Sequence, residues 1–444
     1  MKTSRRSFLK QLSVATAVPF ILPSHIWAAD TQPNDVISIG FIGMGMQSRG
    51  LMEAFLYNQR SRVVAVCDVD TTRREAALRR AKEFYEGNPD RGNVDCQAYV
   101  DYRELIARDD IDAVCVVTPD HWHAIQTIAA LESGKDVYCE KPLTHNVRES
   151  IAVIEAVERH NRVLQTGSMQ RSMREFRVAC ELVQNGTIGT ITHVEARFGS
   201  PGVPCDLPEE EMEPGLDWEK WLGPAPVRPY SSVLSPRGIH GHFPDWRNYR
   251  EFGGGMVTDW GAHHLDIAQW GLNRDNSGPV EIIPPENPEA TSGAVLRYDD
   301  GITVTHGGPF GIHFYGSEGL VKVDRGRIEF WRNNERIAGF LSREDGGSLG
   351  SALDFIENEY LTDAKIKLYQ SGDHVRNFLD CVESRERPIT DAIVGGRSSI
   401  CCHLMNQAYY NHSVIKWEPE AMRYADDNSD PAWLTRSYRE PWTL

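Results

Sequence analysis

Short apolar runs, separated by stretches with helical spacing, dominate the first third of the chain. The apolar runs cover residues 36–42, 62–67, 113–117 and 136–139. Uninterrupted runs of this length are typical of parallel strands that helices bury on both faces. The alternation therefore predicts an α/β domain built on a parallel sheet over residues 35–160.

The rest of the chain has a different pattern. Apolar and polar positions alternate at 190–198 and 280–332, and helical spacing returns at 374–384 and 394–411. Short alternating strands joined by glycine-rich turns favour an antiparallel meander, so we expect a second, α+β domain over residues 161–415. The tail, residues 416–444, is irregular and contains Trp417, Trp433 and Trp442. Because three tryptophans are costly to leave in water, we expect this tail to be a strap over a neighbouring surface.

Residues 1–29 have the features of an export signal. Arg5 and Arg6 are followed by Phe8 and Leu9, and a modest apolar run leads to two small residues at Ala28–Ala29. This arrangement closely resembles the twin-arginine signal, which predicts passage of the folded protein through the twin-arginine export machinery to the periplasm. Folded export suggests a cofactor that is inserted first and held tightly. Removing residues 1–28 deletes four basic and no acidic residues, so the net charge falls from −16 to −20.

Composition narrows the possible functions. A net charge of −16 argues against binding to nucleic acid and to anionic membrane surfaces. The nine cysteines are irregularly spaced and begin only at Cys67, so we expect no disulfide framework, no paired zinc spacing and no lipid anchor after cleavage. His240 and His242 lack a third spaced ligand, and we predict no metal.

A glycine-rich turn lies between the first apolar run and a helical pattern. It reads Gly43-Met44-Gly45-Met46, and Ser48 replaces the third glycine of the strict dinucleotide fingerprint. A strand, a glycine turn and a helix form the context in which that fingerprint binds a pyrophosphate. We therefore expect this turn to bind a dinucleotide.

The second apolar run ends at Asp68, 25 residues after Gly43. A carboxylate at this point accepts the ribose hydroxyls of an adenosine and repels a 2′-phosphate, which favours NAD over NADP. Arg73 and Arg74 lie close enough in sequence to keep NADP open as the less favoured cofactor.

Polar residues also follow the next two apolar runs. Thr118, Pro119 and His123 come after one run, and Glu140 and Lys141 come after the other. The carboxyl ends of parallel strands meet at one edge of the sheet, where ligands of such folds bind. We expect these residues to contact the cofactor, although a surface ion pair would also explain Glu140 and Lys141.

Three consecutive glycines, 253–255, precede a stretch with acids and histidines at helical spacing. Asp259, His263, Asp266 and Trp270 are three or four residues apart and would share one face of a helix. Glycines allow the backbone to pass close to a ligand, so this helix is predicted to line a pocket.

The irregular segment before these glycines, residues 200–250, is rich in aromatic side chains. A segment of this length inside a compact domain is usually a lid or a binding loop. Trp246, Arg247 and Tyr249 would suit a sugar ring, although packing explains any one of them equally well.

From about Asp35 onward the chain resembles the glucose–fructose oxidoreductase / inositol dehydrogenase (Gfo/Idh/MocA) family. The resemblance rests on the glycine turn, Asp68, Thr118-Pro119 with His123, Glu140-Lys141-Pro142 and the Asp259/His263 segment. It implies an N-terminal Rossmann domain and a C-terminal α/β domain with a large open, mainly antiparallel sheet, whose outer face commonly forms the contact in a homo-oligomer. It also gives Lys141, Asp259 and His263 catalytic roles.

The same three residues suit hydride transfer on chemical grounds. His263 is a base that titrates near neutral pH, and Lys141 can hydrogen-bond the reacting oxygen. Asp259 is expected to orient a substrate hydroxyl and to raise the basicity of His263. We predict an NAD-dependent oxidoreductase acting on a secondary hydroxyl of a sugar or glycoside, with the cofactor tightly bound. Two alternatives stay open: an NAD-dependent glycosidase that oxidises its sugar transiently, and a non-catalytic NAD-binding sensor.

Overall fold

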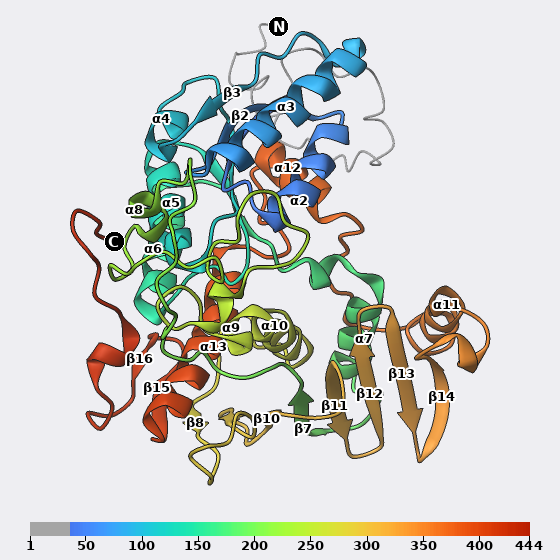
Figure 1. The fold of residues 1–444 in the computed structure, drawn as a ribbon. Coiled ribbons are helices and arrows are strands. Elements are labelled where there is room, and N and C mark those ends of the chain that lie inside the picture. Colours follow the sequence, from blue (N-terminus) through green and yellow to red (C-terminus); the bar gives the residue numbers. More distant parts are fainter. Residues whose placement is uncertain (1–35) are drawn as a thin grey trace, which may run out of the picture. The chain divides into compact units, whose positions relative to one another are not determined.

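The computed structural model describes residues 36–444, so the predicted signal peptide lies outside the described part of the chain. Two β-sheets organise this part (Figure 1). None of its helices is both long and apolar enough to cross a bilayer.

The N-terminal sheet has six parallel strands in the order β3-β2-β1-β4-β5-β6. The strands are β1 (Ile37–Ile42), β2 (Ser61–Cys67), β3 (Gln97–Tyr99), β4 (Ala113–Val116), β5 (Asp136–Cys139) and β6 (Leu164–Thr166). This is the doubly wound order, in which the direction of winding reverses between β1 and β4. The predicted Rossmann sheet is therefore confirmed, and its carboxyl edge at β1 and β4 is where a ligand is expected.

Helices cover both faces of this sheet. One face packs against α2 (Met46–Tyr57), α3 (Thr71–Gly87) and α12 (His374–Ser384), and the other against α4 (Tyr102–Ile106), α5 (Asp120–Glu132) and α6 (Val147–His160). Phe55 of α2 contacts Phe41 of β1 and Phe378 of α12 edge-on, with ring centroids 5.6 and 6.2 Å apart. A helix from the last quarter of the chain thus completes the layer over the N-terminal sheet (Figure 1).

The second sheet has ten strands in the order β14-β13-β12-β11-β7-β10-β9-β8-β15-β16. The strands are β7 (Ile191–Ala196), β8 (Glu281–Ile283), β9 (Val295–Arg297), β10 (Thr303–His306), β11 (Ile312–Gly316), β12 (Gly319–Asp324), β13 (Arg327–Arg332), β14 (Glu335–Phe340), β15 (Ile415–Glu418) and β16 (Arg423–Tyr424). Every neighbouring pair is antiparallel except β7 and β10. The predicted large, mainly antiparallel sheet is confirmed.

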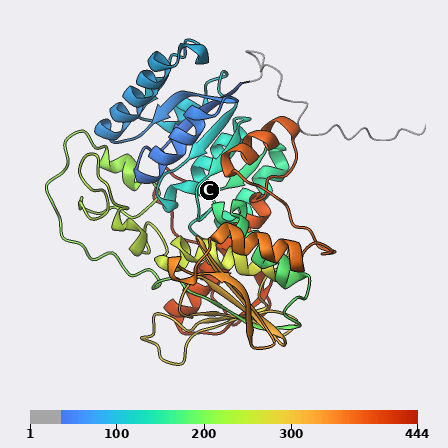
Figure 2. The same cartoon turned by 90° about the vertical axis from the view of Figure 1, so that its right-hand side faces the viewer.

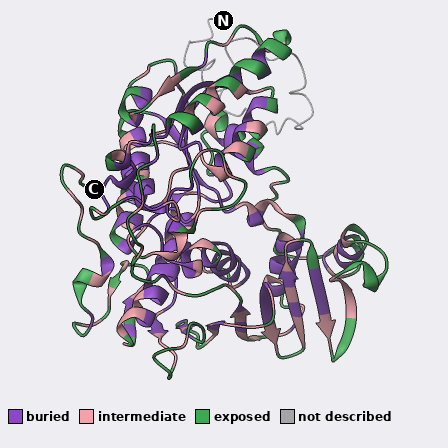
Figure 3. Ribbon diagram, in the orientation of Figure 1, coloured by how far each residue is buried: buried purple, intermediate pink, exposed green. Residues whose placement is uncertain are grey.

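Four helices pack with the second sheet. They are α7 (Arg174–Gln184), α10 (Gly261–Gly271), α11 (Leu349–Tyr360) and α13 (Ala392–Asn411). Alternate strand residues such as Val194, Phe314 and Phe330 point into this core and are fully buried. Figure 3 shows α10 buried along its whole length, whereas the outer side of α11 is exposed. Helix α10 therefore sits between the sheet and the rest of the molecule, where it can present residues to an internal site.

The predicted domain limits stay predictions. Strand β6 continues the first sheet beyond residue 160, and β15 and β16 extend the second sheet beyond residue 415. Hydrogen bonding between strands therefore does not stop at either of these positions.

The aromatic segment between β7 and α9 contains one short helix, α8 (Trp218–Leu222), and a 3-10 turn at Asp245–Asn248. Its large side chains form a small core of their own, in which the rings of Trp218 and Trp221 stack 4.5 Å apart. Figure 2 shows this segment (green) alongside the N-terminal domain. Most of its aromatic rings therefore stabilise the segment itself.

One local prediction is wrong. The expected helix through Asp259 and Trp270 is interrupted at Trp260, giving α9 (Met256–Asp259) and then α10. Helix α3 is capped at its N-terminus by Asp70, whose side chain accepts the backbone N–H of Arg73.

Candidate active site

A cavity of about 440 Å³ lies at the carboxyl edge of the parallel sheet. Residues from the glycine turn, the ends of β2, β4 and β5, the aromatic segment, α9, α10 and the β12–β13 turn line it. A concave site that combines apolar walls with a few converging polar groups is typical of cofactor and small-molecule binding.

The glycine turn approaches the end of β4 very closely. Gly43 has a φ of +88°, and a Cβ atom there would lie 2.8 Å from the backbone of Val117 and Thr118. Gly45 precedes α2 and has open space beside it, with no atom within 4 Å of the position that a Cβ would occupy. The backbone can therefore accept a bulky anion at the N-terminus of α2, where the helix dipole favours negative charge.

Met44 and Met46 differ in position. Met46 lines the cavity, but the side chain of Met44 is buried in the core behind the turn. The backbone N–H of Met44 donates to Asp68 Oδ2 at 2.6 Å. The turn directs the Met44 side chain into the hydrophobic core, so any contact of Met44 with the cofactor would be through its backbone, and this contact stays a prediction.

Asp68 lies in the cavity wall at the end of β2. Its Oδ1 accepts the N–H of Asp70 at 2.8 Å, and burial raises the pKa of this carboxyl. The two neighbouring arginines are occupied elsewhere: Arg74 donates to the Asp68 carbonyl oxygen at 2.9 Å, and Arg73 donates to Ser235 Oγ at 3.2 Å. The Asp68 carboxylate accepts ribose hydroxyls and would repel a 2′-phosphate, so the site favours NAD.

His123 braces the two central strand ends. Its Nδ1 lies 2.7 Å from the Pro142 carbonyl oxygen, and its Nε2 lies 2.8 Å from the Thr118 carbonyl oxygen. Burial lowers the pKa of His123 to about 4, so the ring is neutral and donates to one carbonyl at a time. Thr118, Pro119 and His123 all line the cavity, and His123 holds the chain segments that follow β4 and β5 together.

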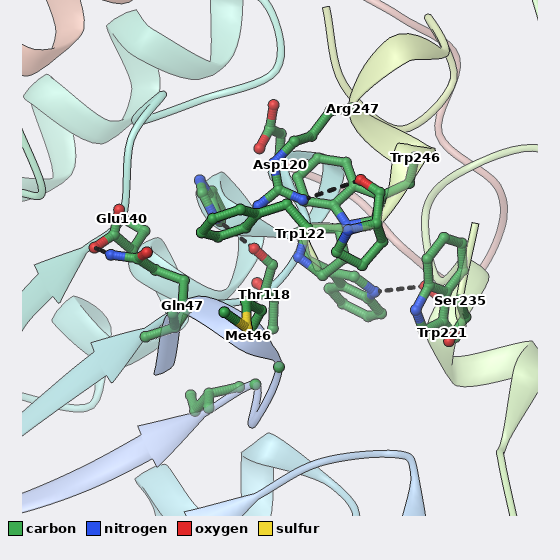
Figure 4. A pocket seen from close by; sticks show the side chains of 18 of the residues that line it. Met46, Gln47, Thr118, Asp120, Trp122, Glu140, Trp221, Ser235, Trp246 and Arg247 are labelled. Carbon is green, nitrogen blue, oxygen red and sulfur yellow. Dashed lines mark hydrogen bonds between the residues drawn. The ribbon is translucent and has the colours of Figure 1, made fainter. Parts of the chain in front are cut away.

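Glu140 links β5 to the glycine-turn helix. Its Oε1 accepts from Gln47 Nε2 at 3.0 Å, as Figure 4 shows, and its Oε2 accepts from the Lys141 backbone at 3.2 Å. A side chain at position 167 would collide with this carboxylate, because a Cβ on Gly167 would lie 2.7 Å from Oε2. Burial raises the pKa of Glu140, although Lys141 and Gln47 oppose that effect.

Lys141 and Asp259 form an ion pair at one end of the cavity. Lys141 Nζ is 2.5 Å from Asp259 Oδ1 and donates to the Asp259 carbonyl oxygen at 3.0 Å. Arg247 Nε lies 3.5 Å from the same carboxylate. Burial opposes ionisation of Asp259, but Lys141 and Arg247 outweigh it and hold the pKa of this carboxyl below its ordinary value.

His263 lines the cavity beside this pair. Its Nδ1 is buried and has no hydrogen-bond partner within residues 36–444. Burial lowers the pKa of His263 well below its ordinary value, and the charges of Lys141 and Arg325 add to the effect. The predicted increase in basicity from Asp259 is therefore wrong, since that carboxylate pairs with Lys141 and Arg247. A neutral imidazole with a free ring nitrogen can still accept a proton.

Asp266 and Trp270 do not belong to this site. The Asp266 carboxylate is fully buried in the second domain and pairs with Arg171, whose Nε is 2.8 Å from Oδ2. Arg171 also lies 5.0 Å from the centroid of the Trp270 ring. Asp266 and Trp270 do not line the cavity, so only His263 of the predicted stripe beyond Asp259 reaches it.

The three glycines before α9 pack against protein rather than ligand. A Cβ on Gly255, whose φ is +71°, would lie 2.3 Å from the Gly202 backbone, and a Cβ on Gly253 would meet Arg247 at 2.9 Å. They allow the aromatic segment to fold back onto the start of α9. This close packing places Arg247 next to Asp259.

Two of the three predicted substrate residues line the cavity. Trp246 and Arg247 do so, and the guanidinium of Arg247 lies 4.2 Å from the Trp246 ring centroid (Figure 4). Tyr249 packs against the small aromatic core of its own segment and does not line the cavity, so its substrate contact stays a prediction.

Several cavity residues were not predicted from the sequence, and the most notable are Asp120, Trp260, Arg325 and Trp442. Asp120 lies beside Arg247 (Figure 4). Burial and the neighbouring Asp259 raise the pKa of Asp120 well above its ordinary value, against the attraction of Arg247. Its position directly after Pro119, at the end of β4, was a signal that pointed to this edge. Arg325 and Trp442 reach the cavity from segments that had no such signal.

No group of three potential metal-ligating side chains occurs among residues 36–444. His240 and His242 lie together, with ring centroids 5.0 Å apart, and no third ligand joins them within the described chain. All nine cysteines are free thiols, and only Cys205 is not buried.

One cavity contains both a glycine turn suited to a dinucleotide and a cluster of polar side chains. It is lined by residues from a doubly wound domain and from a domain with an antiparallel sheet. This combination is typical of two-domain dehydrogenases. Residues 37–168 match the model of an oxidoreductase family with an NAD-binding Rossmann fold, and residues 183–310 match its C-terminal alpha/beta domain. The chain belongs to this family, Gfo/Idh/MocA.

Curated relatives include a glycosyl hydrolase family 109 protein from Shewanella baltica, which is 30% identical over 212 residues. That match covers 44% of this chain and 45% of the relative, so the chain spans about half the length of the curated relatives it matches.

Solved structures share the fold at low identity. WlbA dehydrogenase from Chromobacterium violaceum, in complex with NADH and UDP-GlcNAcA, has a TM-score of 0.59 and 17% identity over 87% of this chain and 97% of that one. A levoglucosan dehydrogenase, in complex with NADH and levoglucosan, has a TM-score of 0.55 and 16% identity over 86% of this chain and 99% of that one. These likenesses establish the fold of the present chain.

Proposed function

We propose that this protein is an NAD-dependent oxidoreductase that moves a hydride between a tightly bound nicotinamide cofactor and a secondary hydroxyl of a sugar or glycoside. The observation that carries the proposal is the arrangement of one cavity. The glycine turn and Asp68 lie along one part of it, and Lys141, Asp259 and His263 converge at another.

The residues present suit NAD. Gly43 leaves no room for a side chain beside β4, Gly45 leaves open space at the start of α2, and Asp68 presents a carboxylate at the end of β2. The turn would hold the pyrophosphate and Asp68 the adenosine ribose. When bound, the nicotinamide supplies the group that takes or returns the hydride.

Lys141 and His263 both act on the substrate oxygen that reacts, one as a hydrogen-bond donor and the other as a base. The Lys141 ammonium donates a hydrogen bond to the reacting oxygen and stabilises the negative charge that develops there. The Asp259 carboxylate, whose Oδ1 is 2.5 Å from Lys141 Nζ, holds the ammonium in position within the cavity. His263 accepts the hydroxyl proton, and its low pKa means that it holds this proton weakly and passes it on readily.

The cavity wall around these groups suits a sugar substrate. Trp246 and Trp260 offer aromatic faces, and Asp120 and Arg247 offer an acceptor and donors for ring hydroxyls. The structural neighbours that were solved with levoglucosan and UDP-GlcNAcA support carbohydrate as the substrate class.

A glycosidase is the second candidate. The curated relatives that match at 30% identity are named glycosyl hydrolase family 109 proteins. Transient oxidation of a sugar hydroxyl would acidify the neighbouring C–H, allow the glycosidic bond to eliminate, and return the cofactor to its starting state. The sensor alternative is less favoured, because a non-catalytic protein has no need for the Lys141–Asp259 pair beside a free imidazole.

Export and assembly form part of the same proposal. We infer that residues 1–29 direct the folded, cofactor-loaded protein to the periplasm by the twin-arginine route, and that the mature protein is a homo-oligomer. If the protein is exported with its cofactor in place, the bound cofactor must be returned to its starting oxidation state by a second substrate, rather than by exchange with free NAD.

A screen of mono- and disaccharides tests the proposal. The purified protein is mixed with each sugar, and cofactor reduction and sugar products are followed together. Reduction with an intact keto-sugar product supports the dehydrogenase, whereas a cleaved glycoside with no net reduction supports the glycosidase. Absence of both results, with the cofactor bound, would leave the sensor.

A further inference from the structure

Five lysine and arginine side chains line the cavity: Arg73, Lys141, Lys220, Arg247 and Arg325. The first four are each paired with an acid: Arg73 with Asp70 at 3.6 Å, Lys141 with Asp259 at 2.5 Å, Lys220 with Asp217 at 2.6 Å and Arg247 with Asp259 at 3.5 Å. Arg325 has no carboxylate oxygen within 4.0 Å anywhere in residues 36–444. It is therefore the one cavity cation in the described chain without an acid partner.

The turn between β12 and β13 holds Arg325 firmly in place. Gly326 has a φ of +73° and its backbone N–H donates to Glu175 Oε1 of α7 at 2.9 Å. The carboxylate of the adjacent Asp324 accepts the backbone N–H of Arg325 at 2.8 Å. The nearest acid therefore fixes the backbone and leaves the guanidinium free.

The guanidinium itself is oriented on two sides. It lies 4.7 Å from the ring centroid of Trp260, which is a cation–π distance. With the Gln170 amide turned so that its nitrogen donates to the His263 carbonyl oxygen at 3.0 Å, its oxygen accepts from Arg325 Nε at 3.3 Å. A guanidinium has five N–H donors, so this contact leaves four of them for a ligand.

Burial makes this free charge costly. The site is sufficiently desolvated to lower the pKa of Arg325, although Asp324, Asp259 and Glu140 oppose the effect. An unpaired, partly buried cation is stabilised strongly by an anion that supplies hydrogen-bond acceptors. The net charge of the chain, −16, gives no long-range attraction for such an anion, so any preference for it must come from a local cation.

We propose that Arg325 binds a carboxylate of the substrate, so that the preferred substrate is an acidic sugar such as a uronic acid or its glycoside. The planar guanidinium fork matches a carboxylate in a bidentate arrangement. The glycine turn and the N-terminus of α2 already provide the place for the pyrophosphate of the cofactor, so a substrate carboxylate is the anion that we assign to Arg325. This inference rests on the proposed oxidoreductase function and names its substrate class.

An acidic substrate also changes the base. Lys141 and Arg325 both depress the pKa of His263. A carboxylate on Arg325 would cancel one of these charges and raise the basicity of His263 when the correct substrate is bound. The substrate carboxylate therefore raises kcat and also lowers KM, whereas a merely attractive surface charge would lower KM alone.

Matched substrates and variants test the proposal. kcat/KM is measured for the methyl glycosides of glucuronic and galacturonic acid and for those of glucose and galactose, with glucose 6-sulfate as a second anion. The proteins are wild type, Arg325→Gln, Arg325→Lys and the control Arg327→Gln. Arg327 is exposed on the same hairpin and does not line the cavity, so its variant removes the same charge from outside the site.

We expect wild type to prefer the uronides. Arg325→Gln should reduce the uronide-to-neutral ratio of kcat/KM by about tenfold to a hundredfold, the usual scale for hydrogen bonds to a charged group. Arg325→Lys should retain part of the preference, and Arg327→Gln should retain all of it. Equal use of neutral sugars by wild type, or an unchanged ratio in Arg325→Gln, would overturn the assignment while leaving the oxidoreductase function intact. A preference for the 6-sulfate that exceeds that for the uronides would overturn the carboxylate assignment.

If no sugar reduces the cofactor, the proposed function fails and binding becomes the readout. Titration of the same sugars into the cofactor-loaded protein by calorimetry should then still show binding of uronides over neutral sugars, with the preference lost in Arg325→Gln. Equal or absent binding of the two kinds of sugar would overturn the inference.

Discussion

Lys141 Nζ lies 2.5 Å from Asp259 Oδ1. This ion pair joins the end of strand β5, in the first sheet, to helix α9, which directly precedes α10 of the second domain. The two residues are 118 positions apart in the chain. Their contact places an ammonium at a fixed point in the cavity and leaves His263 beside it with an unpartnered Nδ1 among the described residues. The chemistry of the site therefore depends on how the two domains meet.

A buried ion-pair cluster lies in the second domain, outside the cavity. Arg171 is 2% exposed and contacts both Asp266 and Asp275. Asp266→Asn should lower the free energy of unfolding by about 3–5 kcal/mol, because it leaves a buried guanidinium partly unpaired. Thermal unfolding measures this loss. Asp275→Asn is the matched control, since Asp275 is more exposed, and its effect should be clearly smaller. Equal effects of the two variants would contradict this account.

Asp68 should set cofactor choice. Asp68→Ser removes the carboxylate that would repel a 2′-phosphate, so the ratio of NAD to NADP affinity should fall by at least about tenfold. Equilibrium binding of both dinucleotides to refolded, cofactor-free protein measures this ratio. A wild-type protein that already prefers NADP would show that the carboxylate at the end of β2 does not set the choice.

Buried neutral histidines should make the fold sensitive to acid. Burial lowers the pKa of His123, His374 and His403 to about 4 in each case, whereas unfolded histidine titrates near 6.5. Between these values the unfolded chain binds more protons, so stability is complete above pH 6.5 and is lost as the pH falls towards 4. Each histidine contributes up to about 1.4 kcal/mol per pH unit to this loss. Denaturant unfolding at pH 7.5, 6 and 5 should show a falling midpoint, and a midpoint that rises on acidification would contradict these pKa directions.

The C-terminal strap should help to retain the cofactor. Trp442 lines the cavity, and its ring centroid is 4.7 Å from that of Trp122. Arg436 anchors the strap to Glu149 at 2.9 Å. Trp442→Ala should weaken NAD binding by about fivefold, since an aromatic contact of this kind contributes on the order of 1 kcal/mol. The control is Trp433→Ala, a strap residue that packs on the second domain's core and does not line the cavity. Cofactor content after dialysis compares the two, and equal retention would contradict the role of Trp442.

The parts of the structure that could be predicted from sequence are those encoded locally. Strands β1, β2, β4 and β5 were visible as apolar runs, and the glycine turn lies next to the strand and helix it joins. Lys141 and Asp68 were found because strand ends of a parallel sheet meet at one edge whatever the rest of the chain does.

The parts that could not be predicted depend on contacts between distant residues. Helix periodicity placed Asp266 on the face of His263, but the structure buries Asp266 in the core of the second domain, where it pairs with Arg171, a residue 95 positions away in the chain. Arg325 occupies a hairpin turn, which sequence alone assigns to the surface. Trp442 reaches the cavity only because the strap folds back onto α5.

Single-turnover reduction of the bound cofactor tests the central claim most directly. Wild type, Lys141→Ala and His263→Ala are purified with their cofactor and mixed with the best sugar from the screen, and absorbance of the reduced nicotinamide is followed. We expect wild type to reduce its cofactor, and each variant to be slower by on the order of a hundredfold, the usual scale for electrostatic and acid–base groups. Both variants should still purify with bound cofactor, because the glycine turn and Asp68, which would hold the pyrophosphate and the adenosine ribose, are left in place. Variants that reduce the cofactor at the wild-type rate would contradict the assignment of this site as the place where the hydroxyl is oxidised.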